Sequence, residues 1–266
     1  SGVSMLFQMP IRLKTCVSQL VLLLACIVLG GCISTTTGGF SEDASPQRAL
    51  DTRVSLARDY IGAGNWVAAK RNLELAMQID DDNAEIYEAF ALVFQSTGEY
   101  ELAEKNFKKS IRLDGKCSRC RNNYAAFLYS QERYEEAEKQ LDYVIQDTLY
   151  SGRPNAFVNL GLCRIQLFDM QGAEEAFVRA LAMDRTNQVA LLEVAQMRFD
   201  AGDYPTANKY YGTYRSVAPQ QSARGLLLGI RLARINSDRN SEASYVLSLS
   251  SRFPNSIEYE AYKRTK

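Results

Sequence analysis

Thiols are the side chains of this sequence whose spacing is most suggestive of chemistry. Cys32 follows Leu-Gly-Gly, Cys117 and Cys120 stand three residues apart, and Cys163 is alone in an apolar stretch. Histidine is absent from all 266 residues, which excludes Ser-His-Asp and Cys-His nucleophile systems and His-ligated metal sites. The three thiols after Cys32 are also fewer than the about four ligands that a structural zinc ion needs. We therefore expect no metal site.

Phosphate-binding loops are absent as well. The sequence contains no Gly-x-Gly-x-x-Gly, and Gly115-Lys116 does not complete a P-loop, because Ser110 replaces the first glycine and Cys117 replaces the final Ser or Thr. Without a histidine or a phosphate loop, we expect a protein that is not an enzyme and that binds no cofactor and no small-molecule substrate.

The paired thiols Cys117 and Cys120 can form a disulfide in an oxidising compartment. A redox role for Cys-x-x-Cys needs a strand-to-helix setting, which a turn between helical repeats does not supply. Cys163 is more simply interpreted as a small core residue.

The compartment is indicated by the amino-terminal part of the sequence. Residues 20–29 form an apolar run of ten residues, about half of the roughly 20 that a membrane-spanning helix needs. Arg12 and Lys14 precede this run, and no acidic residue occurs before Glu42. A basic start, a short apolar run and small residues after it are typical of a secretory signal peptide.

The signal peptide ends in a sequence that resembles the bacterial lipobox, Leu-Gly-Gly-Cys. In a lipobox the cysteine is acylated and the preceding peptide is removed. We therefore predict a signal peptide over residues 1–31, lipidation of Cys32 and a polar tether over residues 32–48. The alternative is an ordinary signal peptide that happens to end near a cysteine.

The charge balance argues against a general nucleic-acid partner. The chain has 31 Lys and Arg against 31 Asp and Glu, and removal of residues 1–31 takes away only Arg12 and Lys14, which leaves 29 against 31. A net charge of −2 gives no overall attraction to a polyanion.

An internal repeat of about 34 residues dominates the rest of the chain. Alanines recur at separations of 34 or 36 residues: Ala69, Ala103, Ala137, Ala173, Ala207 and Ala243. A large apolar residue follows each of them by four positions: Leu73, Phe107, Leu141, Phe177, Tyr211 and Leu247. Small residues precede the first five alanines by twelve positions: Ala57, Ala91, Ala125, Gly161 and Ala195.

This pattern resembles the tetratricopeptide repeat, in which small residues lie where two antiparallel helices cross and large residues fill the gaps beside them. Gly64, Gly98 and Gly202 fall where the first helix of a repeat ends and a left-handed residue is favoured. Glu132 takes this place in the third repeat, which weakens the turn signal without removing it.

The predicted fold is therefore an all-α, right-handed superhelical solenoid of six tetratricopeptide repeats over residues 49–266, with a short capping helix at its end. Residues 147–154 form a longer connection between the third and fourth repeats. In the sixth repeat Ala243 comes two residues late, and we place the two extra residues within 236–240. Stacked repeats bury a continuous core and present a groove lined by the first helices, which suits the binding of a peptide or protein.

Candidate partner-binding residues lie at the inward positions of the first helices. An asparagine there can both donate to and accept from an extended peptide, while nearby apolar groups select its side chains. The candidates are Asn122, Asn123, Tyr129, Asn159, Leu162 and Leu192. The asparagines can alternatively cap a helix or link one helix to another.

A basic stretch over residues 105–121 has two interpretations as well. It holds seven Lys and Arg residues against Asp114 as its one acid. The simpler interpretation is a solvated face of a second helix, and the other is a site for an acidic partner.

Four stretches are more specific than the repeat spacing: NNYAAFLYSQERYEEAEKQL (122–141), QDTLY (146–150), AFVNLGL (156–162) and ARGLLLGIRLA (223–233). Together with the lipobox, the tether and the six repeats, they resemble the PilF/PilW-type pilotin lipoproteins of type IV pilus biogenesis. The Cys117–Cys120 turn is not part of this resemblance.

The resemblance implies a lipoprotein on the periplasmic face of the outer membrane that binds secretin subunits of the type IV pilus machinery. In that family the protein promotes outer-membrane localisation and oligomerisation of the secretin, and Cys32 is the position that carries the lipid. The alternative is another periplasmic repeat lipoprotein, such as a scaffold for β-barrel insertion or for cell-wall enzymes.

Overall fold

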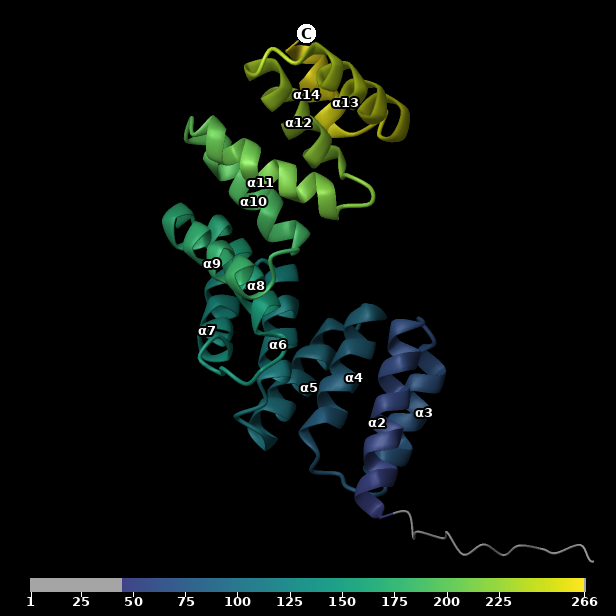
Figure 1. Cartoon of the computed structure of the whole chain (residues 1–266). Helices are drawn as coiled ribbons and strands as arrows, with labels where there is room; N and C mark the ends of the chain where they lie inside the picture. Colours follow the sequence, from purple (N-terminus) through teal and green to yellow (C-terminus); the bar gives the residue numbers. More distant parts are fainter. Residues whose placement is uncertain (1–44, 266) are drawn as a thin grey trace, which may run out of the picture. The chain divides into compact units, whose positions relative to one another are not determined.

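The structure is a computed structural model that describes residues 45–265 (Figure 1). These residues form thirteen α helices and no strand, which confirms the predicted all-α solenoid of six helical repeats. The predicted signal peptide, Cys32 and most of the tether lie outside the described residues. No helix in the described range is both long enough and apolar enough to cross a bilayer.

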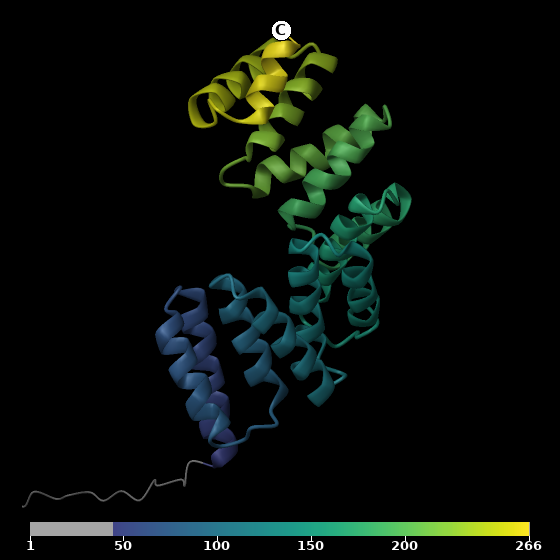
Figure 2. The ribbon, with the colours of Figure 1, turned by 180° about the vertical axis from the view of Figure 1, so that it is seen from behind.

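Twelve of the helices form six consecutive hairpins, which Figures 1 and 2 show from opposite sides. The hairpins are α2 (Pro46–Gly62) with α3 (Trp66–Met77), α4 (Ala84–Ser96) with α5 (Tyr100–Leu113), α6 (Ser118–Ser130) with α7 (Tyr134–Val144), α8 (Arg153–Gln166) with α9 (Met170–Met183), α10 (Gln188–Asp200) with α11 (Tyr204–Val217), and α12 (Ala223–Ile235) with α13 (Arg239–Arg252). A short final helix, α14 (Ile257–Arg264), contacts α12.

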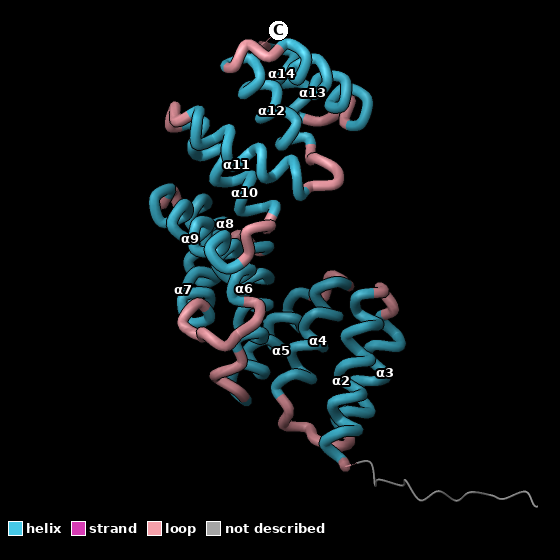
Figure 3. The backbone as a smooth tube through the Cα atoms, in the orientation of Figure 1, coloured by secondary structure: helices cyan, strands magenta, loops and turns pink. Residues whose placement is uncertain are grey.

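The turn inside each hairpin places one residue in the left-handed region. Gly64, Gly98 and Gly202 have φ values of 70°, 81° and 78°, as the repeat pattern predicts. The other three hairpins use residues with a side chain at this place, Glu132, Phe168 and Ser237, with φ between 56° and 62°. The shared turn is therefore imposed by the hairpin as a whole, and glycine only makes it easier. Figure 3 shows these short turns between the helices.

The predicted contacts between the two helices of a hairpin are present in the first five repeats. Ala69, Ala103, Ala137, Ala173 and Ala207 are fully buried, and the large residues that follow them by four positions are at most 5% exposed. Gly161 shows why the crossing needs a small residue, since a Cβ atom there would lie 2.6 Å from the ring of Phe177. One methyl group would push apart helices α8 and α9.

The sixth repeat departs from the predicted register. Ala243 is exposed and Leu247 is 69% exposed, whereas Tyr245 and Leu249 are buried. Its left-handed turn residue, Ser237, follows Gly202 by 35 positions, and the one extra residue lies in the α11–α12 connection, which spans 218–222 where the α9–α10 connection spans only 184–187. The α12–α13 turn over 236–238 is as short as the α10–α11 turn, so our placement of two extra residues within 236–240 is wrong. The ring of Tyr245 packs edge-on against Tyr211, with ring centres 6.1 Å apart, and this bulky contact sets the rotation of α13.

The first helices of neighbouring repeats contact each other directly, α2 with α4, α4 with α6, α6 with α8 and α10 with α12. The second helix of each of the first five repeats instead contacts the first helix of the next repeat, as α3 does with α4. We call the surface carried by α2, α4, α6, α8, α10 and α12 the first-helix face. Polar residues on it that make contacts between repeats include Arg58, Glu85, Glu88, Arg119, Asn122, Asn123, Tyr129, Asn159, Gln166, Glu193 and Arg224.

Candidate partner-binding site

A buried carboxylate links the first three repeats on the first-helix face. Glu88 on α4 is fully buried, and its carboxylate forms an ion pair with Arg58 on α2, at 2.5 Å from Nη2 to Oε2. The side-chain amide of Asn123 on α6 donates to the same carboxylate. Burial of a lone carboxylate is costly, so these partners are what makes Glu88 tolerable at this position.

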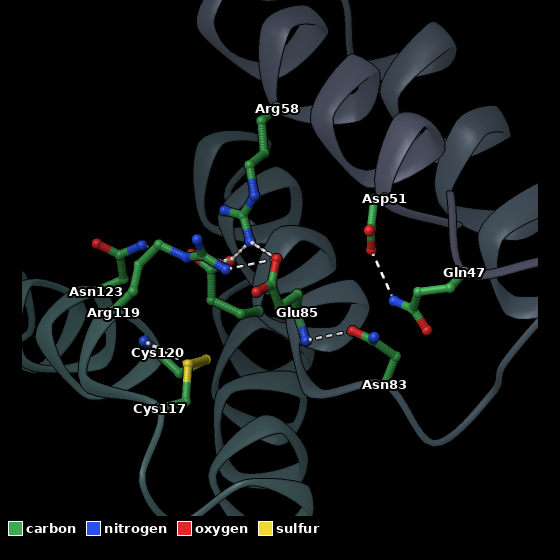
Figure 4. Close-up of polar contacts among 10 residues, drawn as sticks. Gln47, Asp51, Arg58, Asn83, Glu85, Cys117, Arg119, Cys120 and Asn123 are labelled. Carbon is green, nitrogen blue, oxygen red and sulfur yellow. Dashed lines mark hydrogen bonds and ion pairs between the residues drawn. A yellow bond between two sulfur atoms is a disulfide. The ribbon is translucent and has the colours of Figure 1, made fainter. Parts of the chain in front are cut away.

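A second carboxylate extends this group toward solvent. Glu85, one helical turn before Glu88, lies 2.6 Å from Arg119 and 3.6 Å from Arg58. Figure 4 shows both guanidinium groups converging on Glu85 from α2 and α6. We call these residues the carboxylate network: Arg58, Glu85, Glu88, Arg119 and Asn123. It joins three first helices through charge-assisted contacts.

Three of the six predicted binding residues lie around one small pocket between α6 and α8. The pocket has a volume of about 80 Å³ and is lined by Ala125, Ala126, Tyr129, Leu141, Asn159, Leu162 and Cys163. The Asn159 amide donates to the side-chain oxygen of Asn122 at 3.2 Å, which brings a fourth predicted residue into the group. We call Asn122, Tyr129, Asn159 and Leu162 the amide pocket.

The Tyr129 side chain forms one wall of the amide pocket. Its ring packs edge-on against Tyr134, with centres 5.2 Å apart, and its hydroxyl accepts a hydrogen bond from Gln166 at 3.5 Å. Burial raises the pKa of Tyr129, so the hydroxyl remains protonated and neutral. The wall is therefore an uncharged aromatic face with one polar atom.

The remaining two predicted residues lie elsewhere. Asn123 belongs to the carboxylate network, and its donation to Glu88 favours the interpretation of this asparagine as a link between helices. Leu192 on α10 is only 8% exposed and forms part of the hydrophobic core. The structure thus separates Asn123 from Asn159, although they occupy the same position in their repeats.

The three cysteines in the described residues lie in a disulfide or in the protein core. Cys117 and Cys120 are joined by a disulfide across the first turn of α6, next to Arg119 (Figure 4). The free thiol of Cys163 is buried, and burial raises its pKa to about 12, so it stays protonated at neutral pH. Among the described residues no group of three or more His, Cys, Asp or Glu side chains could hold a metal ion.

Sequence reasoning did not identify the buried acids. Glu193 on α10 is 5% exposed, and its carboxylate accepts hydrogen bonds from both terminal nitrogens of Arg224 on α12, one of them at 2.7 Å. The repeat register contains a signal for these residues, because Glu88 precedes Asn122 by 34 positions and Glu193 follows Asn159 by 34. Two neighbouring repeat positions thus carry polar side chains that reach the next first helix.

Comparison with known proteins agrees with this architecture. The tetratricopeptide repeat model matches residues 84–117 and 154–187. The type IV pilus assembly protein PilF of Pseudomonas aeruginosa is 37% identical over 250 residues, which cover 94% of this chain and 98% of that protein.

Two solved structures are similar over most of the chain. The structure of Pseudomonas aeruginosa PilF matches with a TM-score of 0.80 and 38% identity, and covers 83% of this chain and 99% of that one. The crystal structure of PilW, a widely conserved type IV pilus biogenesis factor, matches with a TM-score of 0.69, 24% identity and coverage of 81% and 98%. At that identity the likeness to PilW concerns the fold.

Proposed function

This chain belongs to the PilF family of type IV pilus assembly proteins, and from that premise we propose that it is a pilotin. It binds secretin subunits in the periplasm and promotes their localisation and oligomerisation in the outer membrane. The observation that carries the proposal is the identity of 37%, which extends over 94% of the chain. Such coverage includes the repeats together with the connections between them.

The proposed anchor is a lipid on Cys32. Each buried CH₂ of an acyl chain is worth about 0.8 kcal/mol, and stable attachment takes more than one chain. A lipoprotein cysteine that is acylated on its sulfur and on its amino group meets this need. Ile33 follows in place of the aspartate that favours inner-membrane retention in some bacteria, which suits an outer-membrane destination.

The tether makes anchoring part of the mechanism. The 14 residues from Cys32 to Ser45, which precede α2, can reach at most about 50 Å from the lipid. A secretin subunit held by the repeats then stays at a high effective concentration beside the membrane that it must enter. This mechanism requires no chemical step by the protein.

The amide pocket is our proposed contact for the secretin. An extended segment can place an apolar side chain between Tyr129 and Leu162 while its backbone hydrogen-bonds to the Asn159 side chain. Asn122 orients this amide, and the aromatic wall supplies contact area at a low cost in side-chain entropy.

Secretin capture by the full-length chain tests the proposal. The tagged protein is purified in mild detergent from cells that make type IV pili, and the retained secretin is quantified. The expected result is strong retention by the wild type, reduced by Leu162→Glu and unchanged by Val189→Glu, which alters a 45% exposed residue at the start of α10. Retention of β-barrel insertion factors or cell-wall enzymes without secretin would support the alternative, another periplasmic repeat lipoprotein scaffold.

The anchor is tested separately with Cys32→Ser, which we expect to retain secretin binding while secretin oligomers in the outer membrane decrease. Cys26→Ser is the matched control, since it removes a thiol from the predicted signal peptide and leaves the lipobox intact. Normal oligomers with Cys32→Ser at native expression level would contradict the tethering mechanism.

A further inference from the structure

A second surface with the features of a binding site lies away from the amide pocket, between the second helices α5 and α7. It is a groove of about 510 Å³ lined by Lys108, Ile111, Arg112, Tyr124, Leu128, Glu136, Lys139 and Gln140. Helices α5 and α7 form its walls, and Tyr124 and Leu128 of α6 lie between them. We call this surface the α5–α7 groove. Its volume lies within the range of about 300–1,000 Å³ that is typical of ligand-binding clefts.

The groove has an apolar floor. Ile111 is partly exposed and Tyr124 is 5% exposed, so these two provide the accessible apolar surface of the floor, whereas Leu128 is fully buried and supports them from below. The ring of Tyr124 lies 5.5 Å from that of Phe107 and its hydroxyl donates to Glu104, so its position is fixed. A fixed apolar floor can receive an apolar side chain without rearrangement.

The rim is positively charged once its internal ion pairs are taken into account. Lys108 pairs with Glu104 at 2.7 Å, and Glu136 pairs with Arg133 at 2.7 Å, so these four charges cancel. Arg112 on the α5 wall and Lys139 on the α7 wall are exposed, and neither forms an ion pair with an acid within residues 45–265. Two cations that have no ion-pair partner in the described part of the chain thus face the groove from opposite walls.

We propose that the α5–α7 groove binds an acidic amphipathic segment of a protein partner. An apolar side chain of the segment enters between Ile111 and Tyr124, and carboxylates on either side of it pair with Arg112 and Lys139. Charge complementarity selects this occupant, because a basic segment would leave both cations unpaired and facing like charge.

The recessed floor distinguishes this occupant from an anionic membrane. A planar lipid surface would meet the rim, including the carboxylate of Glu136, without reaching the floor between the two walls. A single side chain can enter the recess. The groove shares helix α6 with the amide pocket but none of its lining residues, so both surfaces can be occupied together.

The test uses the full-length protein in neutral detergent and two short fluorescent probes, an amphipathic peptide of leucine and glutamate and the same peptide with lysine in place of glutamate. We expect the glutamate peptide to bind and the lysine peptide not to bind. The double variant Arg112→Glu/Lys139→Glu should weaken binding at least about tenfold, since it turns two attractions into repulsions. A photoreactive group on the peptide leucine should cross-link to α5, α6 or α7.

The matched control is Arg179→Glu/Arg185→Glu, which changes the net charge equally at two exposed cations on and just after α9. Equal weakening by both double variants, or cross-links that map elsewhere, would overturn the proposal. The proposal would also be overturned if vesicles containing phosphatidylglycerol bound the wild type through Arg112 and Lys139 while the glutamate peptide did not bind.

If the charge reversal impairs folding, Arg112→Gln/Lys139→Gln should still show a smaller loss of peptide binding. Secretin capture depends on other residues, so the two proposals can fail independently.

Discussion

The carboxylate network and the amide pocket lie on the same first-helix face, yet their polar side chains have different partners. In the network, the carboxylate of Glu88 accepts a hydrogen bond from the amide of Asn123 and forms an ion pair with Arg58 of α2, so these polar groups already have partners within the protein. In the pocket, Asn159 donates to Asn122 beside an opening lined by Tyr129 and Leu162. Equivalent repeat positions therefore serve helix linkage in one place and, as we propose, partner binding in the other.

The difference follows from one residue on the preceding helix. The position that precedes Asn123 by 35 residues is the buried acid Glu88, and the corresponding neighbour of Asn159 is the neutral Asn122. A buried carboxylate requires hydrogen-bond donors or a counter-charge, whereas a neutral amide requires no counter-charge. After its one hydrogen bond to Asn122, the Asn159 amide still has a free N–H and a carbonyl oxygen that can bind a ligand. The network is thus expected to contribute mainly to stability, and the pocket mainly to recognition.

The largest effect is expected from Glu88→Gln. Loss of the charge leaves Arg58 without its buried partner, and removal of one member of a buried pair costs about 3–5 kcal/mol. Because Arg58 remains 24% exposed and can be rehydrated, we expect a loss of about 2–3 kcal/mol in the free energy of unfolding, measured by urea titration. Glu85→Gln, at a 48% exposed carboxylate, is the control and should cost about 1 kcal/mol or less. Equal losses would show that burial of Glu88 is not the cause.

A smaller effect separates the two equivalent asparagines. Asn123→Ala should lower the free energy of unfolding by about 1–2 kcal/mol, because Glu88 loses a buried donor, and should leave secretin capture unchanged. Asn159→Ala should cost less than about 1 kcal/mol and should reduce capture. The reverse pattern in these two assays would remove the distinction between network and pocket.

The aromatic wall of the pocket gives a third comparison. Tyr129→Ala should weaken secretin binding about tenfold, since truncation of an anchor side chain in an interface commonly costs more than 1 kcal/mol. Tyr129→Phe keeps the packing against Tyr134 and loses only the long hydrogen bond from Gln166, so its binding should stay close to that of the wild type. Titration of labelled secretin fragments against both variants measures the difference.

Most of the fold could be predicted from the sequence because each repeat places its small and large residues by local helix geometry. The crossing at Ala103 and Phe107, for example, depends only on residues of one hairpin and its neighbour. The sixth repeat could not be predicted in this way. Its register depends on how Tyr245 packs against Tyr211, and the spacing of alanines does not contain that contact.

The candidate site could be predicted only in part. Tyr129, Asn159 and Leu162 share a pocket because they lie at inward positions of adjacent first helices, which the repeat register specifies. The engagement of Asn123 depends on a buried acid in another repeat, and no single-helix pattern indicates which acids are buried. A comparison of equivalent positions in successive repeats would have indicated that Glu88 and Glu193 contact the neighbouring first helices, as Asn122 and Asn159 do.

The smallest effect concerns the α7–α8 connection, which is hydrogen-bonded to the start of α6 through Ser118 and Asp147. Asp147 accepts hydrogen bonds from the Ser118 hydroxyl at 2.5 Å and from the backbone N–H of Leu149 at 3.1 Å, and these bonds, the one from Ser118 first, lower its pKa. A carboxyl group with a lowered pKa in the folded state stabilises above its unfolded pKa of about 3.9, and this contribution disappears as the pH falls through the folded value. Asp147→Asn should therefore lower the melting temperature slightly at neutral pH, and the difference from the wild type should close in acid. Asp82→Asn, at an exposed carboxylate of the α3–α4 turn, is the control, and an equal pH dependence in both variants would show that the Ser118–Asp147 bond does not stabilise this connection.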